Sequence, residues 1–426
     1  MRKILIIAAF LAALVSCGMA TSTDKFVKVI DGQFIRNGKP YRYIGFNFWH
    51  AGILGSEGVN GDRERLLKEL DFLQSVGVNN LRVMIGADGP VTPAKVRPSL
   101  QTQPGVYNDT LLTGLDYLLQ ELNKREMMVV LFFNNTWEWT GGYSQYLEWA
   151  GYGKAPVPVV DGWPVFQEYV GRYMSCVACD SLFKAHVTFI VNRVNSLTGV
   201  PYKEDPAIMS WQIANEPRPM GAQNKRLYEH FIASTAGLIK SLDKNHMVSV
   251  GSEGIYGSEN DPDLYRNVHA LDNIDYLTCH IWPKNWMWLN PSDIPGSLQQ
   301  AIANTNDYID THLTVAGMLN KPLVISEFGL PRDNHKYSRE DPVTCRNAYY
   351  SNIYERMLES LRSGGNFAGC NMWAWGGFAR PDNVFWQEGD EYCGDPIQEE
   401  QGLNSVFAED DTVDLIKKYI QLINEL

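Results

Sequence analysis

The sequence has no excess of basic residues and no long uninterrupted apolar segment. Lysine and arginine total 37 against 49 aspartates and glutamates, which gives a formal net charge of −12 at pH 7. This charge, without a basic stripe, argues against nucleic acid, anionic polysaccharides and anionic membrane surfaces as partners. A neutral partner is the easier fit. After the N-terminus, no segment has the ~20 apolar residues that a membrane-spanning helix needs.

The chain also lacks the spacings that bind metals. The eight histidines show no HxxxH or HxH spacing, and Cys176 and Cys179 have no second CxxC pair to complete a zinc site. We therefore expect neither a metal nor a cofactor. Cys176 and Cys179 stand three apart in a predicted helix and could form a disulfide in an exported protein. Cys279 and Cys370 lie in apolar runs, which favours buried, unreactive side chains.

The first twenty residues have the pattern of an export signal. Arg2 and Lys3 precede an apolar stretch from Ile4 to Val15. Residues 14–17 (LVSC) resemble a bacterial lipobox, which would place a lipid anchor on Cys17, and this reading is favoured. Residues 18–20 (GMA) resemble an ordinary cleavage site, which stays open. We expect a protein that is secreted, or a cell-surface or outer-membrane lipoprotein of a bacterium, with the lipid as its only membrane attachment.

Apolar runs alternate with helical patterns along the rest of the chain. The strand-like runs are Tyr41–Asn47, Asn80–Ile85, Met127–Asn134, Ala207–Asn215, Met247–Gly251, Asp275–His280, Pro322–Glu327 and Gly369–Trp375. The helical patterns are Asp62–Ser75, Asn108–Arg125, Phe166–Ser196, Gln223–Asp243, Ser297–Leu319, Pro342–Ser363 and Thr412–Leu426. Eight such units predict an α/β fold, a single (β/α)₈ barrel domain over residues 24–426, with the weakest helix in the fifth unit.

Turns within Val27–Lys39 predict a β-hairpin that plugs the bottom of this barrel. The loops Asn135–Trp163 and Trp282–Pro295 are long and aromatic. Because loops after strand C-termini build the active site of a barrel, these loops are expected to form a cleft.

Polar residues recur where the apolar strands end. They are Arg82, Asn134, Asn215 with Glu216, His280 and Glu327, and Trp373 and Trp375 end the last strand. The C-terminal ends of parallel barrel strands meet on one face, so these side chains should share one pocket. A lone Asn or Arg at such a place is more often a capping residue. Two glutamates directly after apolar runs are harder to explain structurally, because a buried carboxylate is costly without a partner or a purpose.

Two carboxylates across a barrel mouth suit glycoside hydrolysis. One protonates the leaving oxygen and the other attacks the anomeric carbon, at a separation of about 5–5.5 Å in retaining enzymes. An inverting enzyme that activates water directly would hold them about 6.5–9.5 Å apart, and this stays an alternative. We expect Glu216 to be protonated beside a second carboxylate, and Glu327 to be kept ionised by Arg82.

At this point the motifs resemble a known family. Residues 211–218 (WQIANEPR) resemble the acid/base segment of glycoside hydrolase family 5, and residues 325–329 (ISEFG) resemble its nucleophile segment. Arg82, His280 and Trp373 match further pocket positions of that family. Residues 134–137 (NNTW), 141–146 (GGYSQY) and 194–202 (VNSLTGVPY) are similar to its β-mannanase branch.

The resemblance implies a retaining enzyme that cuts internal β-1,4 bonds of mannan, glucomannan or galactomannan by double displacement. Its catalytic residues would be Glu216 and Glu327. Asn215 would bond the sugar 2-hydroxyl, His280 would donate within the nucleophile network, and Trp373 would form the floor of the cleavage subsite.

One position departs from the family pattern. Many members carry Tyr two residues after the strand-six His, where this chain has Trp282. An indole N–H can donate a hydrogen bond but cannot accept one or ionise, so Trp282 either supplies the donor or serves as a sugar platform. Asn134, Trp137 and Trp49 are further candidates for substrate binding, since aromatic faces stack on the apolar faces of sugars.

Three other functions stay open at this level. An endo-β-1,4-glucanase or an exo-acting β-mannosidase would use the same chemistry, and long loops could close one end of the cleft to give exo action. A surface glycan-binding protein on a decayed barrel is the non-enzymatic alternative. It would be expected to have lost a carboxylate, and both are present. The expected partner is a β-mannan polysaccharide or oligosaccharide, and the expected state is a monomer.

Overall fold

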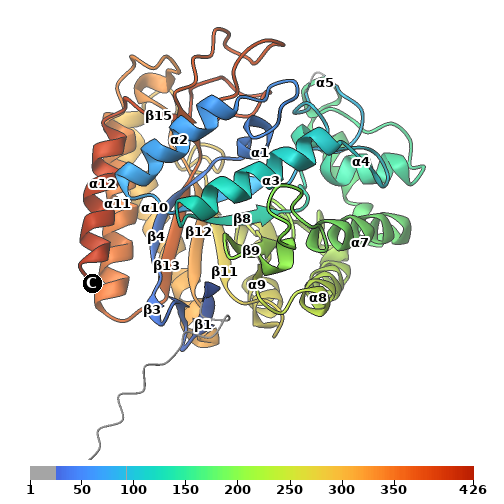
Figure 1. Cartoon of the computed structure of the whole chain (residues 1–426). Helices are drawn as coiled ribbons and strands as arrows, with labels where there is room; N and C mark the ends of the chain where they lie inside the picture. The colour runs from blue at the N-terminus through green and yellow to red at the C-terminus, as the bar shows by residue number, and fades with distance from the viewer. Residues whose placement is uncertain (1–24, 93) are drawn as a thin grey trace, which may run out of the picture.

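The computed structural model describes residues 25–92 and 94–426, and its centre is a sheet of eight parallel strands (Figure 1). The strands are β4 (Tyr43–Asn47), β5 (Asn80–Met84), β8 (Met128–Phe132), β9 (Ile208–Gln212), β10 (Met247–Ser249), β11 (Leu277–Ile281), β12 (Leu323–Phe328) and β13 (Phe367–Met372). They are ordered β10-β9-β8-β5-β4-β13-β12-β11, and a bridge between Ser249 and Tyr276 joins the two ends. Each strand is buried along its whole length, as expected for a barrel covered by helices. The predicted (β/α)₈ fold and all eight predicted strands are confirmed.

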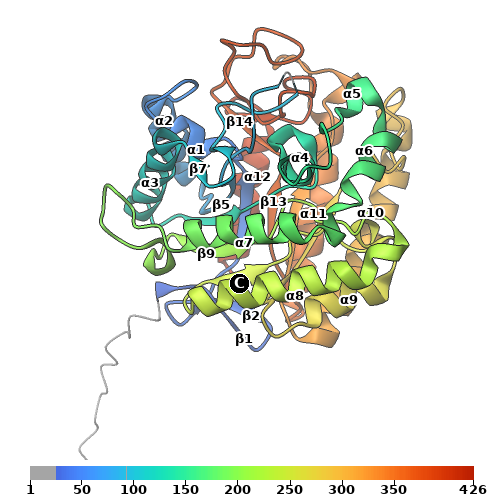
Figure 2. The same ribbon diagram turned by 90° about the vertical axis from the view of Figure 1, so that its right-hand side faces the viewer.

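Helices surround this barrel on all sides in the two views (Figures 1 and 2). The outer helices are α2 (Arg63–Val76), α3 (Asp109–Lys124), α7 (Val177–Val191), α8 (Lys225–Leu242), α9 (Pro262–Ala270), α10 (Ile294–Leu319), α11 (Thr344–Arg362) and α12 (Thr412–Asn424). Their starts follow local chemistry: the Asp62, Asn108, Asp261 and Asp293 side chains each accept a backbone N–H of the first turn. The helix of the fifth unit, α9, has only 9 residues, which agrees with its weak pattern.

The helix predicted over Phe166–Ser196 is wrong as a single element. The chain forms α6 (Trp163–Val170), a 3₁₀ turn at Tyr173–Ser175 and then α7, and the two helical parts meet at 77°. Tyr173 stacks on Tyr143 with ring centroids 3.9 Å apart, so tertiary packing overrides the helical pattern here. Within the described residues no single helix is long and apolar enough to cross a membrane; only this bent pair, taken together, meets the criterion of length and composition.

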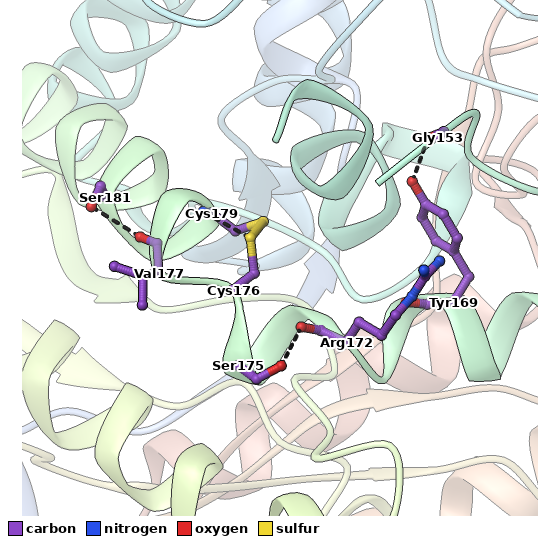
Figure 3. Close-up of a disulfide and its surroundings, with 8 residues drawn as sticks. All are labelled: Gly153, Tyr169, Arg172, Ser175, Cys176, Val177, Cys179 and Ser181. Atoms are coloured by element: carbon purple, nitrogen blue, oxygen red, sulfur yellow. Dashed lines mark hydrogen bonds between the residues drawn. A yellow bond between two sulfur atoms is a disulfide. The ribbon is translucent and has the colours of Figure 1, made fainter. Parts of the chain in front are cut away.

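A disulfide lies at this break (Figure 3). Cys176 is the N-cap of α7, its sulfur accepts the N–H of Cys179, and the two Cα atoms are 5.2 Å apart. The predicted pairing of Cys176 with Cys179 is therefore confirmed. Cys279 and Cys370 are free and buried, as expected.

The barrel bottom is closed by β1 (Lys28–Ile30), β2 (Gln33–Arg36) and β3 (Lys39–Pro40), which pair antiparallel. They lie at the lower end of the barrel in Figure 1. An apolar cluster joins them to the barrel interior: Val27, Phe34, Tyr41, Tyr43, Met128, Val130, Met209, Met247, Tyr276, Val324 and Ala368. The predicted plug is confirmed. The predicted export signal, with Cys17, lies outside the described residues.

The opposite end carries the insertions that shape the cleft. Between β8 and α7 the chain forms α4 (Gly142–Trp149), α5 (Pro158–Asp161) and α6, and shorter elements are α1 (Ala51–Leu54), β6 (Gln101–Gln103) and β7 (Val106–Tyr107). A long loop, residues 378–405, connects β14 (Trp375–Gly377) to β15 (Val406–Phe407) and forms part of the orange-red coil above the barrel in Figure 1. We call it the 378–405 loop.

Candidate active site

The two glutamates meet at the C-terminal end of the barrel. Glu216 follows β9, and Glu327 lies near the end of β12. A carboxylate oxygen of each, with a ring nitrogen of His280, lie within 4.8 Å of one another. Both side chains are buried yet line a cavity of about 560 Å³, a volume typical of small-molecule sites. Residues that are 111 positions apart (327 − 216) in the chain thus face one another across a shared cleft.

Arg82 organises the side of the site around Glu327. From β5 it donates to Glu327 Oε1 at 2.6 Å, Asn215 Oδ1 at 2.7 Å, Gln212 Oε1 at 2.7 Å and Asn47 Oδ1 at 2.9 Å. The guanidinium has no exposed surface, so its charge acts in a weakly screened environment. Every one of its acceptors comes from a strand or a strand end, which holds Glu327 in one orientation.

Trp282 donates from Nε1 to Glu327 Oε2 at 3.3 Å. It also lines the cavity and meets Trp373 edge-to-face, with ring centroids 6.2 Å apart. The indole therefore combines both features that the sequence left open: its N–H donates to Glu327 and its ring lines the cavity.

Glu216 has a different set of contacts. Trp137 Nε1 donates to Glu216 Oε2, and His280 Nδ1 lies 2.7 Å from Oε1. The backbone of Glu216 has a φ of 50°, uncommon for a non-glycine residue, and it is held by bonds from Glu216 N to Gly251 O and from Thr136 Oγ1 to Glu216 O. The strained turn aims the carboxyl group into the cleft.

A second ion pair stands behind Glu216. Arg218 binds Glu253 through Nε and Nη2, and its guanidinium carbon lies 5.0 Å from the centroid of the Trp137 ring. Glu253 is 3% exposed, so this is a mostly buried pair. Arg218 thus braces the indole that bonds Glu216.

The titration behaviour of the site follows from burial and charge. Burial raises the pKa of Glu216, and the charges of Arg218 and Arg82 and the Trp137 N–H oppose that rise. Burial also raises the pKa of Glu327, while Arg82 lowers it and the charge of Glu216 raises it. Two interacting carboxyl groups in one buried site favour the state in which one of them keeps its proton. Burial and the charge of Arg82 depress the pKa of His280, so its imidazole is neutral.

The cavity collects most of the residues that the sequence singled out. Glu216, Glu327, Asn215, Trp137, Trp282 and Trp373 line it. Arg82 and His280 are fully buried directly behind the carboxylates, where they contact them without lining the cavity.

Besides Arg82 and His280, two more of the predicted substrate-binding residues, Trp49 and Asn134, lie outside the cavity lining. Trp49 has no exposed surface, and its Nε1 donates to Gly394 O at 2.8 Å, so it anchors the 378–405 loop instead of stacking on a sugar. Asn134 is 4% exposed, and its side chain turns to accept the N–H of Asn135 at 2.8 Å. Both predictions were wrong because a residue type at a strand end does not fix the direction of its side chain.

Several residues at the cavity were missed. They are Glu138, Trp139, Trp163, Arg218, Glu253 and members of the 378–405 loop. Arg218 directly follows the NEP segment and could have been noticed there. The loop carried no pattern that linked it to the site.

Among the described residues, the one group of three or more His, Cys, Asp and Glu side chains with metal-ligand spacing is Glu216, His280 and Glu327. The guanidinium of Arg82, 2.6 Å from Glu327, already supplies the positive charge at that carboxylate and would repel a cation.

Comparison with known proteins agrees with this site. The model of the family "GH family 5 beta-mannosidase-like" matches residues 24–426. Mannan endo-1,4-beta-mannosidase 4 of Solanum lycopersicum is 29% identical over 365 residues, covering 83% of this chain and 84% of that protein. The crystal structure of a glycoside hydrolase family 5 mannosidase from Rhizomucor miehei is 35% identical, with a TM-score of 0.88 over 95% of this chain and 99% of the other.

An endo-1,4-beta-mannanase from the same fungus shares the fold at 23% identity and a TM-score of 0.68 over 94% of this chain and all of the other. The family match and the 35% identical structure confirm the resemblance read from the motifs. The chain belongs to glycoside hydrolase family 5, in its β-mannosidase-like group, and is a glycoside hydrolase.

Proposed function

We propose that this hydrolase cuts internal β-1,4 bonds of mannan, glucomannan or galactomannan with retention of anomeric configuration. The observation that carries the proposal is the pair of buried carboxyl groups with oxygens within 4.8 Å at one cleft. So close an approach favours the ~5–5.5 Å separation of retaining enzymes over the ~6.5–9.5 Å of inverting ones.

The reaction proceeds in two displacements. Glu216 gives its proton to the glycosidic oxygen while Glu327 Oε attacks the anomeric carbon, so the bond to the leaving sugar breaks as a glycosyl–Glu327 ester forms. Glu216, now ionised, takes a proton from water, whose oxygen attacks the same carbon and releases Glu327 as a carboxylate. Both glutamates return to their starting protonation states.

Neighbouring groups prepare the two steps. Arg82 and the Trp282 N–H stabilise the Glu327 carboxylate, which keeps it ready for attack. Asn215 accepts from Arg82 and donates to Asn135 Oδ1 at 3.2 Å, which leaves one amide N–H for the sugar 2-hydroxyl. Trp373, with Trp139 edge-to-face at 6.1 Å, gives the sugar ring a flat apolar floor.

The relatives support mannose as the sugar. The Solanum lycopersicum relative cited above and one from Arabidopsis thaliana are named mannan endo-1,4-beta-mannosidases, and one Rhizomucor miehei structure is described as a complex with mannosyl-fructose. The net charge of −12 fits a neutral glycan.

A second candidate function is an exo-acting β-mannosidase on the same scaffold. The 378–405 loop favours it, because Phe385, Pro396 and Asn404 of that loop line the cleft and would restrict a long chain. The 35% identical structure is titled a mannosidase. This alternative keeps the double-displacement chemistry and changes only which glycosidic bond of the polysaccharide is cut.

Product analysis tests both candidates. Carob galactomannan, glucomannan, carboxymethyl cellulose and mannohexaose are digested and the products sized over time. Endo action predicts a spread of mannan oligomers from the start, and exo action predicts one short product that accumulates linearly. Proton NMR of the first-formed anomer should show the β form. Preference for the cellulose substrate, or a first-formed α anomer, contradicts the proposal.

Variants at the glutamates complete the test. Glu327→Ala and Glu216→Ala should each lower kcat by orders of magnitude and leave mannan binding intact. Glu388→Gln, at an 82% exposed position, is the matched control and should match the parent. If the parent hydrolyses mannan and Glu327→Ala is equally active, Glu327 is not the nucleophile.

We further propose that the protein is exported and acts as a monomer. The apolar leader and the Cys176–Cys179 disulfide support an oxidising compartment. Fractionation of the parent and of Cys17→Ala distinguishes an anchored lipoprotein, which the substitution releases, from a protein cleaved after Ala20, which it leaves unchanged. Light scattering measures the oligomeric state.

A further inference from the structure

The cleft holds a second group of oxygen acceptors besides the catalytic pair. Glu138, Gln398 and Glu399 all line the cavity. Glu138 is 7% exposed, and its Oε2 has no hydrogen-bond partner in the described chain; Gln398 Oε1 is equally unpartnered. Buried acceptors without donors are costly, and a molecule bound in the cavity with O–H groups would supply the missing donors.

The backbone that carries Gln398 and Glu399 is held in place before any ligand binds. Gln401 Nε2 donates to the carbonyl oxygens of Pro396 at 2.9 Å and Glu399 at 3.0 Å. The buried Asp395 carboxylate accepts from Gly402 N and Asn404 N, both at 2.9 Å. These contacts and the bond from Trp49 to Gly394 hold the 378–405 loop in place, which lowers the entropy cost of binding a ligand there. We call the surface formed by Glu138, Gln398 and Glu399 the wall.

The charges at this wall suit hydroxyl groups. Burial raises the pKa of Glu138 to about 7 and that of Glu399 to about 8; for Glu399 the charges of Asp395, Glu216 and Glu138 add to the rise and Lys284 opposes it. Near neutral pH each carboxyl group is therefore partly protonated and can accept from one hydroxyl and donate to another. An anionic sugar would meet like charge here.

The wall stands beside the acid Glu216. Glu138 directly follows Trp137, whose N–H bonds Glu216, and Glu399 lines the same cavity as Glu216 and Glu138. In glycoside hydrolysis the acid gives its proton to the leaving sugar, so a wall on this side faces that sugar.

We propose that Glu138, Gln398 and Glu399 form a hydroxyl-binding subsite for the leaving-group sugar, selective for a neutral hexose with adjacent hydroxyl groups. The proposal rests on the proposed function and names the second sugar that the site holds. It assigns to the 378–405 loop a role in recognising the substrate as well as in enclosing the cleft.

The test compares two substrates that share the attacked sugar and differ in the leaving group. Mannotriose offers hydroxyl groups to the wall, and 4-nitrophenyl β-mannoside offers none. For Glu138→Ala, Glu399→Ala and Gln398→Ala we expect KM for mannotriose to rise about tenfold, as for loss of one hydrogen bond to a charged or buried group. KM and kcat for the aryl mannoside should stay within about twofold. Glu388→Gln, on the same loop, is the matched control and should leave both substrates unchanged.

Two results would overturn the subsite. Unchanged KM for mannotriose in all three variants removes it. Equal losses on both substrates show that the residues act on Glu216 or on the attacked sugar. If Glu138→Ala fails to fold, as judged by circular dichroism, the less buried Glu399 and Gln398 variants decide.

A parent without activity on any β-mannoside would refute the proposed function separately. Calorimetric titration of parent and Glu399→Ala with mannotriose and cellotriose then still tests the subsite: an affinity about tenfold lower in the variant supports it, and equal affinity overturns it.

Discussion

Replacing Arg82 by Met tests how much the Arg82–Glu327 ion pair contributes to the stability of the fold and to catalysis. The change deletes the guanidinium and keeps a side chain of similar length, which leaves the buried Glu327 carboxylate and three amide oxygens without their donor. Breaking one side of a buried ion pair costs about 3–5 kcal/mol, because the remaining charge is uncompensated. We expect the free energy of unfolding in urea to fall by about that amount, and kcat by about 100-fold or more, the usual scale for losing a preorganised electrostatic partner.

The pH profile of kcat/KM tests the direction in which Arg82 shifts the pKa of Glu327. Arg82 lowers the pKa of Glu327, so its removal raises that pKa. Glu327 must be ionised to attack, and the acid limb of kcat/KM should therefore move to higher pH in Arg82→Met. A protonated Glu327 no longer carries a buried charge, so the stability loss should be smaller at low pH than at neutral pH.

Two further variants make the reasoning refutable. Arg82→Met/Glu327→Leu removes both charges and should recover much of the lost stability while staying inactive. Arg193→Met breaks another largely buried pair, with Asp116 at 2.6 Å, and neither residue lines the cavity; it should cost stability and leave the acid limb in place. An acid limb that does not move in Arg82→Met, or a double variant no more stable than the single one, would refute the role given to Arg82.

Three other perturbations follow from the same contacts. Trp282→Phe loses the N–H to Glu327 and should lower kcat/KM about tenfold in steady-state assays, and Trp282→Tyr, which restores a donor, should recover part of the loss; equal activity of the two variants contradicts the donor role. Glu216→Gln should unfold at higher temperature than the parent, by a margin that grows as pH rises above 4.5, because the raised pKa of Glu216 means that the folded state keeps a proton which the unfolded chain releases; a constant margin from pH 4 to 8 in calorimetry would show otherwise. Reduction of Cys176–Cys179 should lower the free energy of unfolding by no more than about 2 kcal/mol, since the disulfide closes a loop of only four residues, and urea titration with and without dithiothreitol measures it.

Local pattern was enough to predict the barrel because the strands are buried on both faces. Met128–Phe132 and Leu323–Phe328 are apolar almost throughout, and only a parallel sheet under helices requires such runs. The same burial on both faces located Glu216 and Glu327, because a carboxyl group that follows such an apolar run lies at the C-terminal end of the barrel, where the strand ends meet. Sequence therefore predicts best where one physical constraint acts on a whole segment.

The errors came from contacts between distant segments. Trp49 was expected in the cleft, yet its indole N–H bonds Gly394, 345 positions away, and nothing near Trp49 announces that partner. The break between α6 and α7 depends on Tyr173 stacking on Tyr143 from another helix. The acceptor wall of the 378–405 loop was missed for the same reason, because its Glu and Gln residues meet Glu138 only in the folded chain.

The roles of the two catalytic glutamates follow from which buried carboxyl groups pair with an arginine. The sequence alone does not show this pairing. Glu216, Glu253 and Glu327 are all buried at the cleft, and two guanidinium groups serve them. Arg82 is committed to Glu327 and Arg218 to Glu253, so Glu216 is the carboxyl group without a cation of its own and faces neutral donors from Trp137 and a neutral His280. A proton held by the pair is least costly on Glu216 and most costly on Glu327, where it would strand the charge of Arg82. The difference in protonation that double displacement needs is thus set by which of the two glutamates has an arginine as its partner: Glu327 pairs with Arg82, and Glu216 pairs with none.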